Sequence, residues 1–158
     1  MEAVVTSSKT AGGKTTVLMK WTLNGNPVQD ETYIITASGV SRAKSGAKGS
    51  VTVSPPVPVI KNPMAVGKSW TWKGTISPGA QKIAGTATLK VGARETVKSA
   101  AGSFSAFRVD MVLNFTAQGR AFKIPNSYWF APGAGLVRQR ASVGPTTIEA
   151  TVTKFQIK

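Results

Sequence analysis

The sequence predicts a single all-β domain over residues 1–158, built from about eight to ten antiparallel strands with little or no helix. Apolar and polar residues alternate in run after run, as in strands with one buried and one wet face. Turn-forming Gly, Pro, Asn and Ser pairs separate these runs at short intervals. The chain is also long enough for one well-buried core and short for two domains.

The alternating runs define the expected strands. In chain order they cover residues 17–23, 70–76, 83–91, 107–115 and 146–157. Residues 107–115 would also place three apolar side chains on one helix face, but five apolar residues in strict alternation favour a strand. The last run changes its buried parity partway, which predicts either a bulge near Thr153-Lys154 or a strand that crosses from the core to a contact at the rim.

Turn signals between the runs predict hairpins at Gln118-Gly119, Pro132-Gly133 and Gly144-Pro145. The sequence of residues 8–15 is similar to that of a phosphate-binding loop. That motif needs a Gly where Ser8 stands and a helix after it, so a hairpin is favoured.

Two stretches are expected to be irregular. Residues 42–50 combine cations with Ser, Gly and Ala, which predicts a mobile loop. Residues 54–60 contain three prolines, which predict an extended, polyproline-like crossover because proline cannot donate to a strand ladder.

The composition argues against catalysis. The chain has no Cys and no His, which removes thiolate nucleophiles, zinc–thiolate sites and the commonest general base. Its six carboxylates are scattered, and none forms an evident acid–base pair or metal cage. We therefore expect no enzyme activity, no metal and no cofactor. A Ser–Lys pair is the one nucleophile arrangement that the composition permits.

The net charge of +14 is concentrated in the second part of the chain. Residues 1–60 carry six cations and three carboxylates, whereas residues 61–158 carry fourteen cations and three carboxylates. Such a field attracts anionic surfaces and nucleic acid. The cations are dispersed, however, without a polybasic run, so we expect nucleic acid to bind only weakly.

The sequence contains no apolar stretch of membrane-spanning length. Its first residues lack the basic and apolar regions of a signal peptide. We expect that the sequence begins inside a longer exported precursor.

Three blocks carry a resemblance to known proteins: PMAVGKSWTW at 63–72, ETVKSAAGSFSAFRV at 95–109 and YWFAPGAGLVR at 128–138. In this order and spacing they resemble a group of bacterial cell-envelope proteins of unknown function, including TapB-like pilus-associated proteins. The third block is the most specific. Ala100 stands where the group usually has Pro, which changes a turn and no chemistry.

The resemblance implies a periplasmic or surface protein, often lipid-anchored, with a curved antiparallel sheet or half-barrel similar to that of lipoprotein carriers. A β-sandwich is the alternative fold. It also implies a non-catalytic module that binds a lipid or an envelope protein partner. No catalytic residues follow from it.

Candidate binding residues are aromatic or cationic. Trp70, Trp72, Tyr128 and Phe130 alternate so as to favour the core, whereas Trp129 faces the other way and fits core or surface equally. Arg138 and Arg140 share a strand face, with Arg120 and Lys123 expected nearby, as an anion site or simply as a solvated face. Lys68 and Lys73, with the two arginines, would meet an anionic head group at the rim of a half-barrel.

Overall fold

The computed structural model describes residues 2–151 as one antiparallel sheet of eleven strands. The strands are β1 (Glu2–Ala11), β2 (Lys14–Leu23), β3 (Asn26–Thr36), β4 (Gly39–Ser45), β5 (Val51–Lys61), β6 (Ser69–Pro78), β7 (Ile83–Ser99), β8 (Gly102–Ala117), β9 (Arg120–Ala131), β10 (Gly135–Val143) and β11 (Thr146–Thr151). A single 3₁₀ turn, Ala47–Gly49, separates β4 from β5. The order of the strands in the sheet is their order in the chain.

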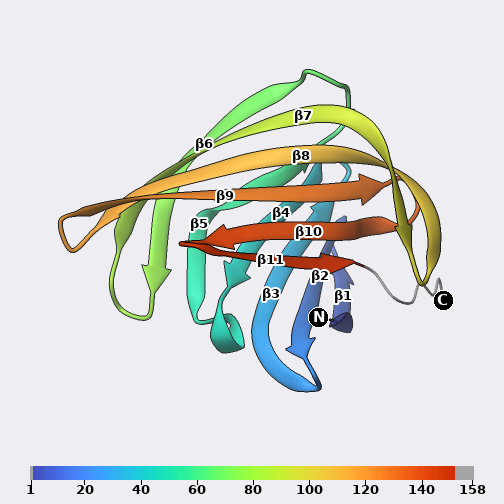
Figure 1. Cartoon of the computed structure of the whole chain (residues 1–158). Coiled ribbons are helices and arrows are strands. Elements are labelled where there is room, and N and C mark those ends of the chain that lie inside the picture. Colours follow the sequence, from blue (N-terminus) through green and yellow to red (C-terminus); the bar gives the residue numbers. More distant parts are fainter. Residues whose placement is uncertain (1, 152–158) are drawn as a thin grey trace.

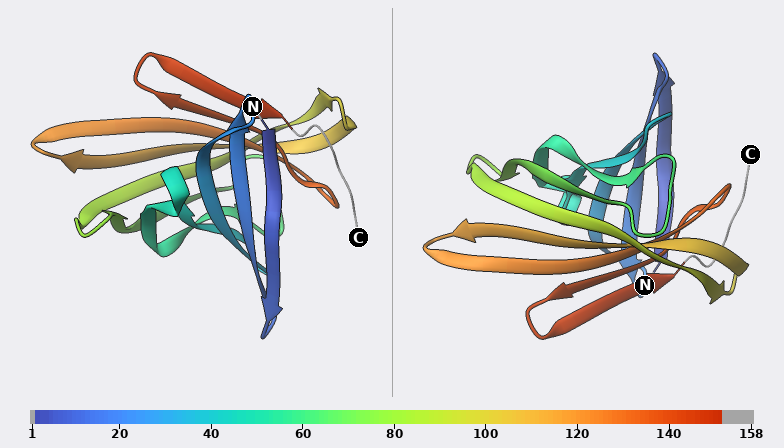
Figure 2. Two further views of the ribbon diagram at one scale, coloured as in Figure 1. Left: turned by 90° about the horizontal axis from the view of Figure 1, so that it is seen from below. Right: turned by 90° about the horizontal axis from the view of Figure 1, so that it is seen from above.

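The sheet curls over on itself into a nearly closed barrel (Figure 1). Figure 2 shows the first strands crossing the layer formed by β7 to β11. Strands β1 and β11 are the two terminal strands of the sheet. They approach each other at the opening, but no ladder joins them. The predicted all-β class and curved sheet are confirmed.

The predicted hairpins are present at the expected turns. Gln118 and Gly119 both have positive φ, at 50° and 72°, and join β8 to β9 with Phe115 opposite Phe122. Gly144-Pro145 joins β10 to β11, and Ala141 lies opposite Ile148. Residues 8–15 form the β1–β2 hairpin, as favoured over a phosphate-binding loop.

The two segments predicted to be irregular contain strands, so that prediction was wrong in part. Residues 42–45 of the cationic stretch belong to β4, where Arg42 points inward and finds polar partners, whereas residues 46–50 form the irregular connection to β5. The proline-rich stretch is β5, whose pairing with β4 contains two register shifts. These irregularities accommodate residues that cannot donate to a ladder. The structure has eleven strands where eight to ten were predicted.

The ladder between β5 and β6 is short, and two tryptophans extend the connection. It covers only four residues of β5, from Val51 to Ser54. Beyond it, Trp72 Nε1 donates to the Pro55 carbonyl at 2.8 Å and Trp70 Nε1 to the Pro58 carbonyl at 2.7 Å. A Cβ on Gly74 would lie 2.5 Å from the Ser54 carbonyl oxygen, so this approach requires glycine.

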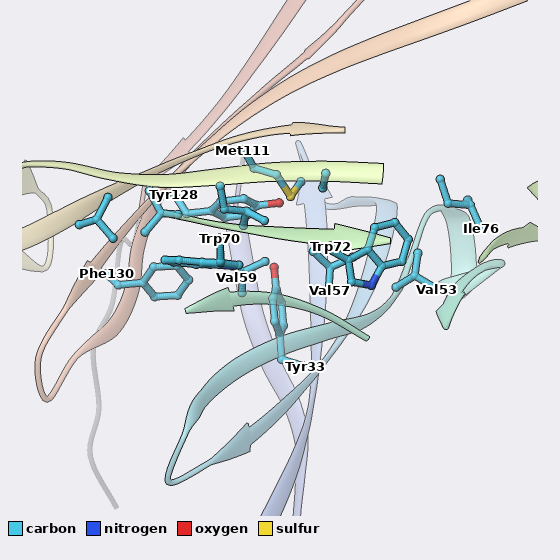
Figure 3. Close-up of a cluster of buried hydrophobic side chains, with 14 of the residues drawn as sticks. Tyr33, Val53, Val57, Val59, Trp70, Trp72, Ile76, Met111, Tyr128 and Phe130 are labelled. Atoms are coloured by element: carbon cyan, nitrogen blue, oxygen red, sulfur yellow. The ribbon is translucent and has the colours of Figure 1, made fainter. Parts of the chain in front are cut away.

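The main core lies on the concave side of the sheet (Figure 3). It contains Trp70, Trp72, Tyr128 and Phe130, which confirms their assignment to the core. Trp129 is also buried, 2% exposed, but belongs to a second cluster on the opposite face with Val97, Ala106, Ala131 and Val137.

The expected bulge near Thr153 lies outside the described residues. Over residues 2–151, the structure contains no helix with the length and apolar character needed to cross a membrane.

Candidate functional site

A large cavity lies inside the curved sheet, between β1–β3 and β9–β11. Its volume is about 1310 Å³, larger than the range of about 300–1,000 Å³ that is usual for small-molecule sites. Side chains that face inward from several neighbouring strands form its wall, and the wall is mainly apolar. They include Val17, Met19, Ile35, Val40, Phe130 and Leu136. Such a cavity suits a ligand with a long apolar part.

A buried carboxylate lies behind one part of this wall. Glu31 in β3 is fully buried. Its Oε2 accepts hydrogen bonds of 2.8 Å from Trp21 Nε1 and from the Tyr33 hydroxyl, and its Oε1 accepts one of 2.9 Å from Gln29 Nε2. Trp21 and Tyr33 themselves border the cavity. These donors supply the hydrogen bonds that a buried carboxylate needs.

Arg42 neutralises this carboxylate. Its Nη1 lies 3.6 Å from Glu31 Oε1 and donates to the Tyr128 hydroxyl at 2.8 Å. Burial alone would lower the pKa of Arg42, but the attraction of Tyr128 and Glu31 raises it. The guanidinium is therefore permanently charged and ties β4 to β9 across the interior.

Burial also raises the pKa of both tyrosine hydroxyls. For Tyr128 burial is the largest cause, partly offset by Arg42, and the pKa rises to about 12. For Tyr33 burial and the neighbouring Glu31 charge raise the pKa well above 10.0. Both hydroxyls thus remain protonated at neutral pH and can serve only as neutral hydrogen-bond groups.

Two side chains that border the cavity have a buried polar atom without a partner among the described residues, Gln139 at Oε1 and Arg138 at Nε. Gln139 in β10 is 7% exposed and lies opposite Tyr128 in the β9–β10 ladder. None of the described residues bonds its Oε1, and the same holds for the buried Nε of Arg42. A buried acceptor of this kind calls for a water molecule or a ligand group.

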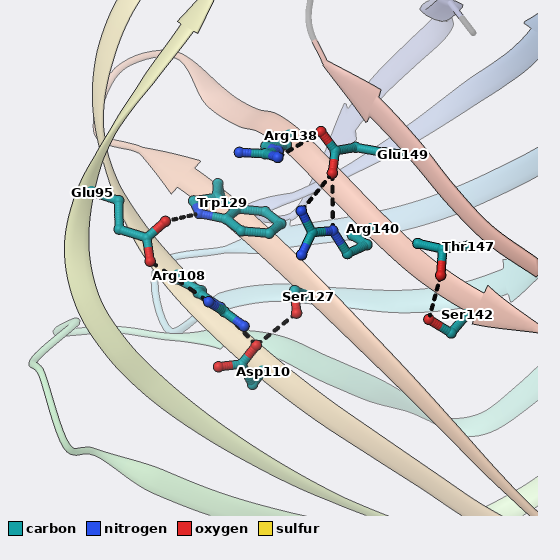
Figure 4. Close-up of polar contacts among 10 residues, drawn as sticks. All are labelled: Glu95, Arg108, Asp110, Ser127, Trp129, Arg138, Arg140, Ser142, Thr147 and Glu149. Carbon is teal, nitrogen blue, oxygen red and sulfur yellow. Dashed lines mark hydrogen bonds and ion pairs between the residues drawn. The ribbon is translucent and has the colours of Figure 1, made fainter.

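On the convex face, three arginines surround the indole of Trp129 (Figure 4). Arg108 in β8 and Arg138 in β10 lie directly opposite Trp129 on the two flanking strands. Arg140 follows two residues after Arg138 and lies on the same face of β10. Their guanidinium carbons lie 5.4, 4.7 and 5.8 Å from the ring, within the range of cation–π contacts. The indole Nε1 donates to Glu95 Oε2 at 2.6 Å.

Carboxylates already occupy these arginines. Glu149 binds Arg138 at 2.6 Å and Arg140 at 2.8 Å. Arg108 pairs with Asp110 at 2.9 Å and with Glu95 at 3.7 Å. Although partial burial acts in the other direction, the hydrogen bonds from Arg140 and Arg138 lower the pKa of Glu149. Three arginines facing three carboxylates leave this cluster without a surplus of positive charge for an anion.

The structure separates the other cations proposed for the site. Arg120 and Lys123 lie near the β8–β9 turn, beyond the end of the β9–β10 ladder, and not beside Arg138. Lys68 Nζ donates to the carbonyls of Lys61 at 3.1 Å and Pro63 at 2.9 Å, where it supports the turn before β6.

Lys73 is exposed in the middle of β6, opposite Thr86. It stands apart from both the arginine cluster and the turn that Lys68 supports. Only Trp129, Arg138 and Arg140 of the predicted set therefore lie together.

Sequence reasoning missed the buried polar group of Glu31, Arg42 and Gln139. One signal was present. Gln29 and Glu31 have the same parity as Tyr33 in one strand, so if Tyr33 faces the core, Glu31 faces it too. Arg42 and Gln139 gave no comparable signal, because cations and glutamines usually mark wet faces.

No known protein family matches this sequence, and no curated protein resembles it. Two solved structures share the fold. A candidate exported protein with a YmcC-like fold from Bacteroides fragilis matches with a TM-score of 0.56 and 14% identity, over 98% of this chain and 86% of that one. A candidate lipoprotein from Parabacteroides distasonis matches with a TM-score of 0.59 and 14% identity, over the same shares. At this identity, the likeness is one of fold.

Proposed function

We propose that this chain is a non-catalytic binding module of the bacterial envelope that holds a lipid in the cavity of its curved sheet. The cavity carries the proposal, because a space of about 1310 Å³ with a mainly apolar wall is costly to leave filled with water. An apolar chain would replace that water and bury the wall.

Two further observations support the proposal. The structures that share the fold are described as exported or as lipoproteins, which favours a place in the periplasm or at the cell surface. The envelope-protein blocks in the sequence favour the same place.

The test is binding of the neutral apolar dye N-phenyl-1-naphthylamine, whose fluorescence rises in an apolar site. The native protein should bind it, and Ala150→Trp should weaken binding at least tenfold. Ala150 is 6% exposed and borders the cavity, so an indole there would occupy ligand space. Thr147→Trp, on exposed β11 surface, is the matched control and should bind as the native protein does. Equal binding by native protein and Ala150→Trp would reject the cavity as the site.

A second function has its own supporting observation. All ten residues of the terminal strand β1 are exposed, including Val4 and Val5 at 54% and 53%. A long exposed edge can accept a strand from a partner, here an envelope protein. Native mass spectrometry of protein from its own envelope separates the two functions: a bound lipid mass supports the first, and a discrete larger complex supports the second.

A further inference from the structure

We infer that the cavity selects a neutral amphiphile, a long apolar chain ending in a hydroxyl group, and that Gln139 binds this hydroxyl. The inference rests on the proposed function and names the class of lipid. It excludes the ionised fatty acid as the preferred ligand.

The position of Gln139 is the first step. Its side chain borders the cavity and is more than nine-tenths buried, yet no described residue bonds its Oε1. A buried amide oxygen without a partner weakens the fold, so the position favours a ligand that donates a hydrogen bond. A hydroxyl both donates and accepts, and it therefore suits the amide in either of its two orientations.

The charge of the wall is the second step. Glu31 and Arg42 compensate each other, and neither borders the cavity. Two charged residues do border it. Glu2 is exposed and negative, and the charge of Arg138 is neutralised by Glu149, which binds its Nη2 and leaves its buried Nε without a partner among the described residues. A carboxylate entering this space would lose its water without gaining a free cation. A neutral head group carries no such penalty.

The polar groups around Gln139 also fit a small head group. Tyr128, directly across the ladder, already accepts a hydrogen bond from Arg42. Tyr33 directs its hydroxyl to Glu31. Tyr33 thus donates its proton and Tyr128 is occupied as an acceptor, so the amide oxygen of Gln139 is the one acceptor without a donor among these three side chains. One hydroxyl on the ligand satisfies it.

The experiment uses displacement of N-phenyl-1-naphthylamine at pH 8 by three ligands of equal chain length. These are 1-dodecanol, dodecyl methyl ether and dodecanoate, which present a hydroxyl, an acceptor without a donor, and an anion. We expect 1-dodecanol to bind about 3- to 10-fold more tightly than the ether, the usual effect of one neutral hydrogen bond. Dodecanoate should bind more weakly than 1-dodecanol.

Gln139→Met keeps the length of the side chain and removes its polar group, so the preference for alcohol over ether should vanish while dye binding persists. The control is Gln29→Met, which removes a hydrogen bond to Glu31 behind the wall and should retain the preference. Gln139→Leu serves if the Met variant fails to fold.

Each outcome decides a separate question. Absence of dye binding by the native protein rejects the proposed function itself. Dye binding with equal affinities for alcohol and ether overturns the inference, since a water molecule then satisfies Gln139 in every complex. A preference that survives both Gln139 variants, or tighter binding of dodecanoate, overturns it as well.

Discussion

Replacement of Glu31 by glutamine should be among the most destabilising conservative changes in this protein. The carboxylate accepts three hydrogen bonds, from Trp21, Tyr33 and Gln29, and faces Arg42 at 3.6 Å. A glutamine offers one oxygen, so its amino group must face at least one existing donor. It also leaves the buried guanidinium without its counter-charge. Removing one member of a buried ion pair costs about 3–5 kcal/mol, and we expect Glu31→Gln to lose stability in this range.

Urea unfolding followed by tryptophan fluorescence measures the effect, with the slope expected to remain constant. The matched control is Glu149→Gln, which also faces arginines but is partly exposed, and which should cost about 0–1 kcal/mol. The double variant Glu31→Gln/Arg42→Met should recover part of the loss, because it removes the orphaned charge. A loss below about 1 kcal/mol for Glu31→Gln, or a double variant with strictly additive losses, would refute this reasoning.

Three further predictions follow from the buried aromatics and the surface charge. The only two tyrosines, Tyr33 and Tyr128, have raised pKa values in the folded state, so their contribution to stability is complete below pH 10. The contribution of Tyr128 is lost as pH rises through about 12 and that of Tyr33 at a pH well above 10; tyrosinate absorbance that appears near pH 10 in folded protein would contradict this. Trp129→Phe should lower the free energy of unfolding by about 1–3 kcal/mol, because Glu95 loses its indole donor and three arginines lose the stronger cation–π partner. Urea titration measures the effect, and an unchanged unfolding midpoint would contradict the prediction. Binding to duplex DNA should weaken steeply with salt, with each neutralised phosphate adding about 0.9 to the slope of log K against log salt concentration, and should vanish near about 0.2 M. Sub-micromolar affinity at that salt, measured by fluorescence anisotropy, would instead make nucleic-acid binding the main function.

The strands that could be predicted from the sequence are those whose side chains follow the pleat. In β8, Phe107, Val109, Met111 and Leu113 share one parity, and apart from Val112 the residues between them are polar, so the order of residues indicates which face is buried. The β8–β9 and β10–β11 turns were predictable for a similar reason, because Gly119 and Gly144 supply backbone angles that other residues rarely adopt.

The strands β4 and β5 could not be predicted, because tertiary contacts determine them. Arg42 is acceptable inside only because Glu31 meets it from the neighbouring strand and Tyr128 meets it from β9, 86 residues away. The carbonyls of Pro55 and Pro58 are bonded by tryptophan side chains where the ladder ends. Local strand propensity predicts neither the buried partners of Arg42 nor the hydrogen bonds to the proline carbonyls.

The candidate site was predicted in part. The shared face of Arg138 and Arg140 follows from their spacing, and the structure places both beside Trp129. The cavity had no signature in the sequence, since its wall is made of ordinary core residues that curvature holds apart. Glu149 was equally hidden as a partner, because it comes from the next strand of the sheet.

The order of the strands also bears on how the chain acquires its structure. Every ladder in the sheet joins segments that are adjacent in the sequence, so each new hairpin can form on the one before it as the polypeptide emerges. Only the final closure must bring remote segments together. The bond between Arg42 and Tyr128, 86 residues apart, belongs to that closure. Half-made sheets would therefore be well paired along their strands yet still open to solvent on the side that later faces the cavity.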